Sequence, residues 1–391
     1  MIRRRVTALL LSVYMIMSTV GCTKTAAVDE VENTNTTVET TASAVEERDN
    51  GEEGTRTIID QVDNEVVLPE KIERVVIASV WPLASVYILS MGTDKLVGLD
   101  PAIISAAENS ILIKIAPEIS EIDSSFSQGG YMNVEELMKL DPDVVLYSAA
   151  IPEDYEVATQ AGIPAVGFSL SIKDYNAVET INSWIELLEE VMGEDISSAE
   201  YVEYGNQIQD LVAERLKDVK EEDKPTCMVI HKYADDIISV PGTNTWADYW
   251  ITASGGINVA STETGTKETS MEQVYAWNPD KILITNFNDA LPEDIYNNEL
   301  CSSDWSTINA VQKEDVKKIP LGMYRWYVTC SDSPMMLLWM AMQNHPELFE
   351  DIDFNETMKE FYRKFYDVEL TDEDMEQILN PNREAAGGIK K

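Results

Sequence analysis

The chain has 391 residues and is strongly acidic, because 70 Asp and Glu residues against 29 Lys and Arg residues give a formal net charge of -41 at pH 7. Nucleic-acid binding depends on clustered Lys and Arg, so this balance excludes a protein that binds a phosphate backbone. Two histidines, with no Gly-x-Ser-x-Gly, His-Glu-x-x-His or phosphate-loop pattern, give no catalytic residue to propose, and we expect no enzyme.

The first residues have the layout of a secretory signal peptide. Three arginines at positions 3 to 5 precede an uncharged apolar run from Val6 to Met17, which ends at small residues. Residues 1–21 are interpreted as this signal, and no later segment is predicted to span a membrane. The cleavage region resembles a bacterial lipobox, although Thr19 stands where Leu is usual. We expect lipidation of Cys22 and an extracytoplasmic protein anchored to the cell membrane by that lipid alone. Ordinary cleavage, with an incidental thiol at position 22, is the alternative.

Residues 22–55 are predicted to form a disordered acidic tether. This segment is rich in Thr, Glu and Ala and has no aromatic residue, so it cannot bury enough apolar area to offset its ordering entropy. About 335 residues follow, more than one ordinary core holds and enough for two lobes.

The first lobe, residues 56–171, alternates strand and helix patterns. A helix is predicted over Leu83 to Met91, closed by Gly92. A capping box at Asn133 begins another helix, which Pro142 ends. The predicted strands are short apolar runs, Val75 to Ala78, Leu96 to Leu99, Val144 to Leu146 and Ala165 to Phe168. This alternation predicts a sheet covered by helices on both faces.

Residues 172–194 are predicted to form a helix that joins two lobes. Apolar residues recur at helical spacing from Asp174 to Met192, and Gly193 stops the pattern. Such a helix is about 28 Å long, enough to bridge the lobes. Because the connection is one stiff helix, we expect only a small lobe rotation on ligand binding.

The second lobe, residues 195–391, repeats the pattern of the first. A capping box at Ser270 and a stop at Pro279 recur at a constant offset from the first-lobe copy. The other predicted elements are helices Ser197 to Val219 and Trp246 to Ser254 and strands Cys227 to His231, Ile257 to Val259 and Ile282 to Ile284. The predicted fold class is α/β, with two lobes joined by a long rigid α-helix.

The order and spacing of these segments resemble the class III, or cluster A, substrate-binding proteins of ABC importers for iron siderophores, haem and cobalamin. The resemblance covers Thr57 to about Leu379 and rests on Ile59 to Pro69, Arg74 to Ala78, Gly92 to Gly98, Asn133 to Val145, Gly255 to Ala260 and His345 to Phe365. It implies the class III fold of two Rossmann-like lobes, with a ligand held between the lobes and delivered to a permease and its ATPase. We expect a monomer without a covalent cofactor that binds an iron(III) chelate, most simply a ferric siderophore. Haem, cobalamin and nickel or other metal complexes are the alternatives, since fold does not fix ligand identity. A surface hydrolase or an adhesin is less favoured.

Ligands of open α/β sheets bind beyond the carboxyl ends of the strands, which selects residues just after strand ends. The ligand-binding candidates are Trp81, Gln128, Tyr131, Trp246, Tyr324, Arg325 and Trp326. Arg325 among aromatic residues suits an anionic, ring-bearing ligand, because a guanidinium both pairs with carboxylates and stacks on rings. We expect it to face Trp81 across the cleft. The alternative for each aromatic residue is packing in the core. For the loop that carries Gln128 and Tyr131, the alternative is that Gly129 and Gly130 only make a turn.

Two further sets of candidates complete the sequence predictions. His231 is a possible metal ligand, although a single hydrogen-bonded histidine is the commoner case and a bare-metal site needs several ligands. The family resemblance implies one acidic docking residue on each lobe for the permease, and Glu108 and Glu263 are the candidates; an exposed glutamate is, however, usually only solvated. Three cysteines follow the tether, so at most one disulfide can form.

Overall fold

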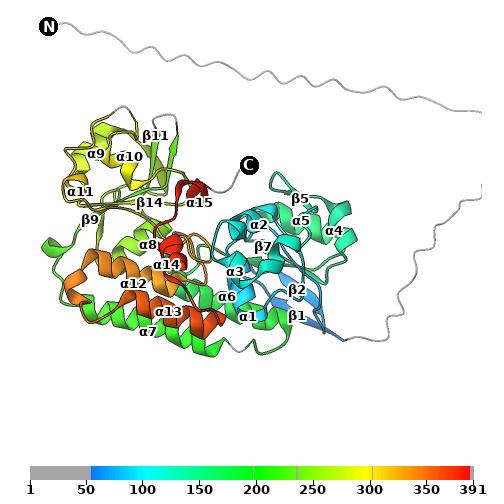
Figure 1. The fold of residues 1–391 in the computed structure, drawn as a ribbon. Helices are drawn as coiled ribbons and strands as arrows, with labels where there is room; N and C mark the ends of the chain where they lie inside the picture. Colours follow the sequence, from blue (N-terminus) through cyan, green and yellow to red (C-terminus); the bar gives the residue numbers. More distant parts are fainter. Residues whose placement is uncertain (1–53, 197, 235–236, 302, 388–391) are drawn as a thin grey trace, which may run out of the picture. The chain divides into compact units, whose positions relative to one another are not determined.

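Short apolar runs form two four-stranded parallel sheets in the computed structural model, which describes residues 54–391 except 197, 235–236, 302 and 388–391 (Figure 1). The predicted signal peptide, Cys22 and nearly all of the predicted tether lie outside the described residues. Residues 54 onward belong to one compact unit. Within the described ranges, no helix is both long enough and apolar enough to cross a bilayer.

The first sheet has the strand order β4-β3-β7-β8. Its strands are β3 (Val75–Ile77), β4 (Leu96–Leu99), β7 (Val144–Ser148) and β8 (Ala165–Phe168). Both β7 and β8 are buried along their whole length, as expected for parallel strands covered on two faces. The helices of this lobe are α1 (Leu83–Met91), α2 (Pro101–Glu108), α3 (Leu112–Ile115), α4 (Val134–Leu140) and α5 (Pro152–Gln160). Two antiparallel pairs complete it, β1 (Thr55–Ile59) with β2 (Glu65–Pro69) and β5 (Ser127–Gln128) with β6 (Tyr131–Met132).

The second sheet has the equivalent order β12-β9-β14-β15. Its strands are β9 (Thr226–Ile230), β12 (Ile257–Asn258), β14 (Lys281–Ile284) and β15 (Val316–Lys318). An antiparallel sheet of β10 (Lys232–Ala234), β11 (Ile237–Pro241) and β13 (Thr266–Thr269) adjoins it. The helices of this lobe are α8 (Trp246–Ala253), α9 (Met271–Trp277), α10 (Pro292–Tyr296) and α11 (Asn309–Gln312). The predicted α/β class with two similar lobes is confirmed.

The duplicated unit consists of α4 with β7 and α9 with β14. The side chain of Asn133 accepts hydrogen bonds from two amides of the first turn of α4, and Ser270 accepts one in α9. Each helix ends at a left-handed residue, Asp141 (φ 47°) or Asn278 (φ 42°), directly before the predicted proline. Asp and Asn adopt this conformation more readily than most residues, and proline cannot continue a helix, so the same local chemistry ends both copies.

The connecting helix α6 (Ala177–Met192) begins three residues later than predicted. Residues Lys173–Tyr175 form a separate 3-10 turn in which Asp174 has a φ of 53°. Asn176 then caps α6 by accepting a hydrogen bond from the amide of Glu179. Hydrophobic spacing could not show this break, because the apolar residues of α6 all lie after it. Gly193 ends the helix in the left-handed conformation, as predicted.

The C-terminal helices pack beside the second long helix, α7 (Ala199–Leu216). Helices α12 (Ser333–Asn344) and α13 (Phe354–Tyr366) lie along it (Figure 1). The contact with α13 includes Tyr201, whose ring centroid lies 5.3 Å from that of Phe365. Helices α14 (Asp372–Leu379) and α15 (Arg383–Gly387) follow. The three cysteines of the described chain, at 227, 301 and 330, are buried free thiols.

Candidate functional site

The carboxyl ends of the second sheet bring together residues that are far apart in the sequence. His231 follows β9, Phe287 comes shortly after β14, and Arg325 lies in the loop that follows β15. Because the three strands are parallel and adjacent, their carboxyl ends meet at one edge of the sheet. This edge is therefore the candidate site.

Arg325 is a buried cation whose guanidinium has no partner of opposite charge. Its side chain is 3% exposed, and it forms no ion pair or side-chain hydrogen bond with any residue that the structure describes. Its guanidinium carbon lies 4.8 Å from the centroid of the Phe287 ring, a cation–π contact. Burial lowers the pKa of Arg325 from its ordinary value. Buried charges are ordinarily paired, so this arrangement suits an anionic ligand.

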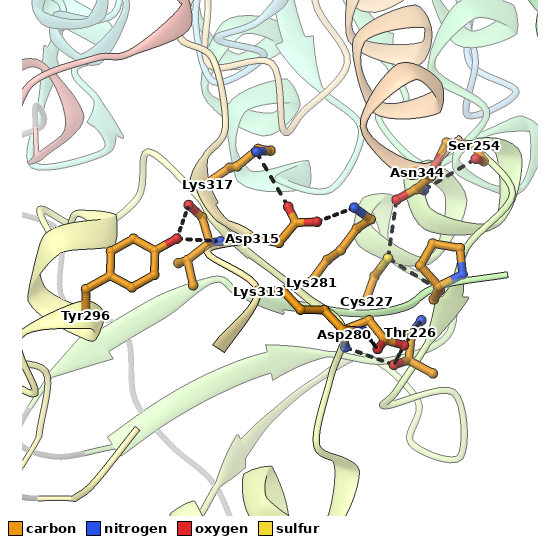
Figure 2. A network of polar contacts seen from close by, with 12 residues as sticks. Thr226, Cys227, Ser254, Asp280, Lys281, Tyr296, Lys313, Asp315, Lys317 and Asn344 are labelled. Atoms are coloured by element: carbon orange, nitrogen blue, oxygen red, sulfur yellow. Dashed lines mark hydrogen bonds and ion pairs between the residues drawn. The ribbon is translucent and has the colours of Figure 1, made fainter. Parts of the chain in front are cut away.

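The opposite edge of the same sheet shows the ordinary arrangement. There the lysines drawn in Figure 2 have carboxylate partners: Lys281 and Lys317 with Asp315, and Lys313 with Asp280. The carboxylate of Asp280 also accepts hydrogen bonds from the amide and hydroxyl of Thr226, at the start of β9. Polar groups thus stabilise the amino edge of this sheet, whereas Arg325 at its carboxyl edge has no ion-pair partner within the described chain.

Five ring-bearing residues, which we call the aromatic cluster, surround this edge. They are Tyr175, His231, Trp246, Phe287 and Tyr327. His231 lies with its ring centroid 5.2 Å from Phe287 and 5.3 Å from Tyr327. The indole of Trp246 lies edge-on to both Tyr175 and Tyr327 and donates to the hydroxyl of Thr329. The cluster therefore joins the turn before α6 to the strand ends of the second lobe.

His231 supplies a neutral imidazole to the site. Burial lowers the pKa of His231 to about 4, and the charge of Lys232 adds to the effect. Its Nδ1 atom is buried and has no hydrogen-bond partner among the described residues. Over the described ranges, no three His, Cys, Asp or Glu residues come together to hold a metal ion. The geometry thus favours His231 as a hydrogen-bonding group and not as part of a bare-metal centre.

The two aromatic residues that flank Arg325 in the sequence are both buried. Trp326 is fully buried, and its indole donates to Asp332 at 2.8 Å, so it is enclosed in the core and cannot reach a ligand in this arrangement. Tyr324 is also buried; burial raises its pKa to about 12, and the charge of the nearby Arg325 acts against that shift. The guanidinium of Arg325 lies over the ring of Phe287, which in turn contacts the ring of Tyr327.

The first-lobe candidates differ in exposure. Trp81 is half-buried in the turn just before α1, and its indole nitrogen is buried without a partner in the described chain. Gln128 and Tyr131 pair across the β5–β6 hairpin, where Tyr131 is 79% exposed. Gly129 and Gly130 have φ values of 62° and 83° and make the turn of that hairpin. The facing of Trp81 and Arg325 across a cleft stays a prediction.

The loop that carries Arg325 touches the first lobe directly. The amide of Ile111 donates to the carbonyl of Gly322 at 3.3 Å, and the hydroxyl of Ser110 donates to the carbonyl of Met323 at 3.3 Å. Further along, the amide of Ser331 donates to the hydroxyl of Ser85 in α1 at 3.2 Å. A ligand at Arg325 would therefore lie next to a segment that contacts both lobes.

Sequence reasoning did not single out Lys318, which lies at the end of β15 and is buried. Its ammonium donates to the backbone carbonyls of Asn288 and Ala290 at 2.9 and 2.7 Å, so it fixes the loop after β14 that carries Phe287. Burial lowers the pKa of Lys318 to about 7. The available signal was its place directly before Ile319 and Pro320, the residues that lead into the loop of Arg325.

The two predicted docking residues occupy unrelated places. Glu108 ends α2, whereas Glu263 lies in a turn between β12 and β13; both are exposed. The duplication identifies a better matched pair, Glu135 in the first turn of α4 and Glu272 in the first turn of α9, and both of these are also exposed. The constant offset between the two copies already contained this signal.

Comparisons with known proteins give concordant results. A family model described as periplasmic binding protein matches residues 88–321. The molybdate-binding protein MolA of Haemophilus influenzae is 26% identical over 335 residues, which are 80% of this chain and 91% of MolA. A periplasmic solute binding protein from Veillonella parvula is 30% identical, with a TM-score of 0.74 over 84% of this chain and 97% of that one. Two further solved structures have the same fold. One is MolA bound to molybdate, which is 24% identical with a TM-score of 0.67 over 81% of this chain and 99% of that one. The other is Helicobacter pylori CeuE with a nickel–histidine complex, which is 22% identical with a TM-score of 0.63 over 83% of this chain and 98% of that one.

Proposed function

The chain belongs to the class III periplasmic binding protein family, and we propose that it captures an anionic metal compound at Arg325 and the aromatic cluster for an ABC importer. Members of this family are extracytoplasmic solute-binding proteins of ABC transporters and not enzymes. The observation that carries the ligand proposal is the unpaired guanidinium of Arg325, buried at the carboxyl edge of the second sheet.

The energetics favour an anion at this position. Leaving a charge buried without a partner costs several kcal/mol, a cost that an anionic ligand offsets when it binds. The protein as a whole carries a formal charge of -41, which repels anions at a distance. A local cation in a water-poor site therefore has to supply the attraction.

Two ligand chemistries fit this description, and the enclosure of the site ranks them. Because Arg325 and Tyr327 are almost completely buried, a compact oxyanion such as the molybdate bound by MolA fits best. A ferric siderophore, expected from the sequence, is the second candidate; the unpartnered indole nitrogen of the half-buried Trp81 favours it, because a larger chelate would need a donor from the first lobe.

The proposal includes the partners of the binding protein. We propose lipid attachment at Cys22, action as a monomer, and delivery to a permease and its ATPase. For docking we propose Glu135 and Glu272 in preference to Glu108 and Glu263, because only the first pair occupies equivalent, exposed positions on the two lobes.

A ligand panel tests the proposed function. Purified protein would be titrated with molybdate, tungstate, sulfate, a ferric catecholate, haem, cobalamin, free Ni²⁺ and a nickel–histidine complex, with calorimetry and tryptophan fluorescence as readouts. Saturable binding of molybdate or of the ferric catecholate, without turnover, is expected. Saturable binding of only a neutral or cationic compound would contradict an anion site at Arg325.

A further inference from the structure

The carboxylate of Asp332 is fully buried and accepts hydrogen bonds from neutral donors only. Its Oδ2 atom accepts from the amide of Met323 at 2.7 Å, the indole of Trp326 at 2.8 Å and the hydroxyl of Tyr362 at 2.7 Å, and Oδ1 accepts from the hydroxyl of Tyr366 at 3.4 Å. Among the described residues, no cationic side chain pairs with it. Neutral donors therefore satisfy Asp332 without the use of a cation.

Two of these donors belong to the loop that carries Arg325 and lie on either side of it in the sequence. This loop has an unusual backbone, because Gly322 has a φ of 56° and Arg325 has a φ of 33°. A Cβ atom at Gly322 would lie 1.9 Å from the indole nitrogen of Trp326 and 2.1 Å from Oδ2 of Asp332, so only glycine fits beside this hydrogen-bonded group. A left-handed arginine costs about 1 to 3 kcal/mol and persists only where its surroundings enforce it.

The two buried ionisable side chains of this segment, Asp332 and Arg325, thus form no ion pair with each other. Had Asp332 paired with Arg325, the guanidinium would have been neutralised within the chain and would attract no ligand. The donors from the loop and from α13 satisfy Asp332 instead, and Arg325 keeps its charge for an anion.

Resting on the proposed function, we infer that Asp332 is a positioning residue, which holds the Gly322–Trp326 loop so that the guanidinium of Arg325 is presented to the ligand. It acts through Arg325 and does not contact the ligand itself. This role predicts energetic coupling between the two residues, which a purely structural contribution of Asp332 would not produce.

A double-mutant cycle with molybdate as the probe, and a ferric catecholate measured in parallel, tests the coupling. Asp332→Ala and Arg325→Ala should each raise Kd about tenfold or more, and the double variant should bind no more weakly than Arg325→Ala alone. Asp332→Asn should retain most of the affinity, because its amide oxygen can replace Oδ2 as the acceptor. Losses that multiply in the double variant would overturn the positioning role.

Hydrogen exchange in the ligand-free protein separates failure of this inference from failure of the proposed site. Peptides that cover the Gly322–Trp326 loop should exchange faster in Asp332→Ala than in the wild type, and those from the β5–β6 hairpin should not change. Tyr362→Phe, which removes a 2.7 Å bond to Oδ2, should loosen the loop more than the matched Tyr366→Phe, which removes a 3.4 Å bond to Oδ1.

Each outcome of these measurements decides one of the two proposals. Unchanged loop exchange in Asp332→Ala would overturn the positioning role. Faster loop exchange in Asp332→Ala, together with wild-type affinity in Arg325→Ala, would refute the proposed site. The role of Asp332 in binding would then be refuted with it. If Asp332→Ala does not fold, Trp326→Phe takes its place in both experiments, because it removes the indole donor to Asp332 and keeps a smaller aromatic ring at that position.

Discussion

Replacing Arg325 with alanine separates a ligand-binding role from a packing role, because the two roles predict opposite results for affinity and stability. In the binding role, the variant loses a charge-assisted hydrogen bond to the anion. Such a bond contributes about 1.5 to 3 kcal/mol, so Kd should rise roughly tenfold to a hundredfold.

The structure also predicts the stability of the ligand-free variant. Arg325 is 3% exposed and has no ion-pair partner among the described residues, so its removal relieves a desolvation cost on the order of several kcal/mol. The lost cation–π contact with Phe287 contributes only about 0.5 to 2 kcal/mol. The free energy of unfolding without ligand should therefore stay level or increase, whereas the stabilisation by ligand should shrink.

Calorimetry and thermal melting with and without molybdate measure the two effects. Arg215→Ala is the matched control, because Arg215 also lies over a ring, 5.1 Å from the centroid of Phe349, but is paired with Asp351 at the surface. The control should leave Kd unchanged. An Arg325→Ala protein with wild-type affinity and a lowered melting temperature would refute the reasoning and assign Arg325 to packing.

Three further predictions follow from other parts of the chain. Cys22→Ala should leave the protein unlipidated, so that it no longer partitions into the detergent phase; unchanged partitioning would exclude Cys22 as the anchor. Charge reversal at Glu135 and Glu272 together should reduce ligand uptake in cells without changing Kd, whereas charge reversal at Glu108 should leave uptake intact. Equal uptake in both variants would contradict permease docking through Glu135 and Glu272. Burial lowers the pKa of Lys318 to about 7, whereas its pKa in the unfolded chain is about 10.4. Between these pH values the unfolded chain binds more protons than the folded chain. The free energy of unfolding should therefore rise from about pH 7 to about pH 10. Lys318→Met should flatten this rise in urea titrations, and an unaltered pH profile would contradict the assignment.

Much of the fold could be predicted from local sequence chemistry. Helix α1 and strands β4 and β8 have the predicted bounds, because glycine or proline stops and short apolar runs mark them. The duplicated helix–turn–strand unit was recognisable from its N-caps and prolines, and the structure gives its two copies the same place in two equivalent sheets. The predicted start of α6 was wrong, because the turn of left-handed residues before it gives no hydrophobic pattern in the sequence.

The candidate site could be predicted only in part. The rule that ligands bind beyond strand ends selected Arg325 and Trp246 in the second lobe, and both lie at the carboxyl edge of the second sheet. The rule could not say which way each side chain of the Met323–Tyr327 segment points, because left-handed backbone at Gly322 and Arg325 turns neighbours in different directions. Trp326 therefore points into the core, and the ring over which Arg325 lies belongs to Phe287, 38 positions before Arg325.

The sequence by itself determined the parts of this protein that depend on neighbouring residues: the helix caps and stops and the repeated helix–turn–strand unit. The tertiary structure alone decided which charges are paired. Asp332 and Arg325 are close in sequence and opposite in charge, yet Asp332 takes its hydrogen bonds from Trp326 and from helix α13, and Arg325 is left over the ring of Phe287. Pairing depends on which groups packing brings within hydrogen-bond distance, and that distance is a property of the folded chain.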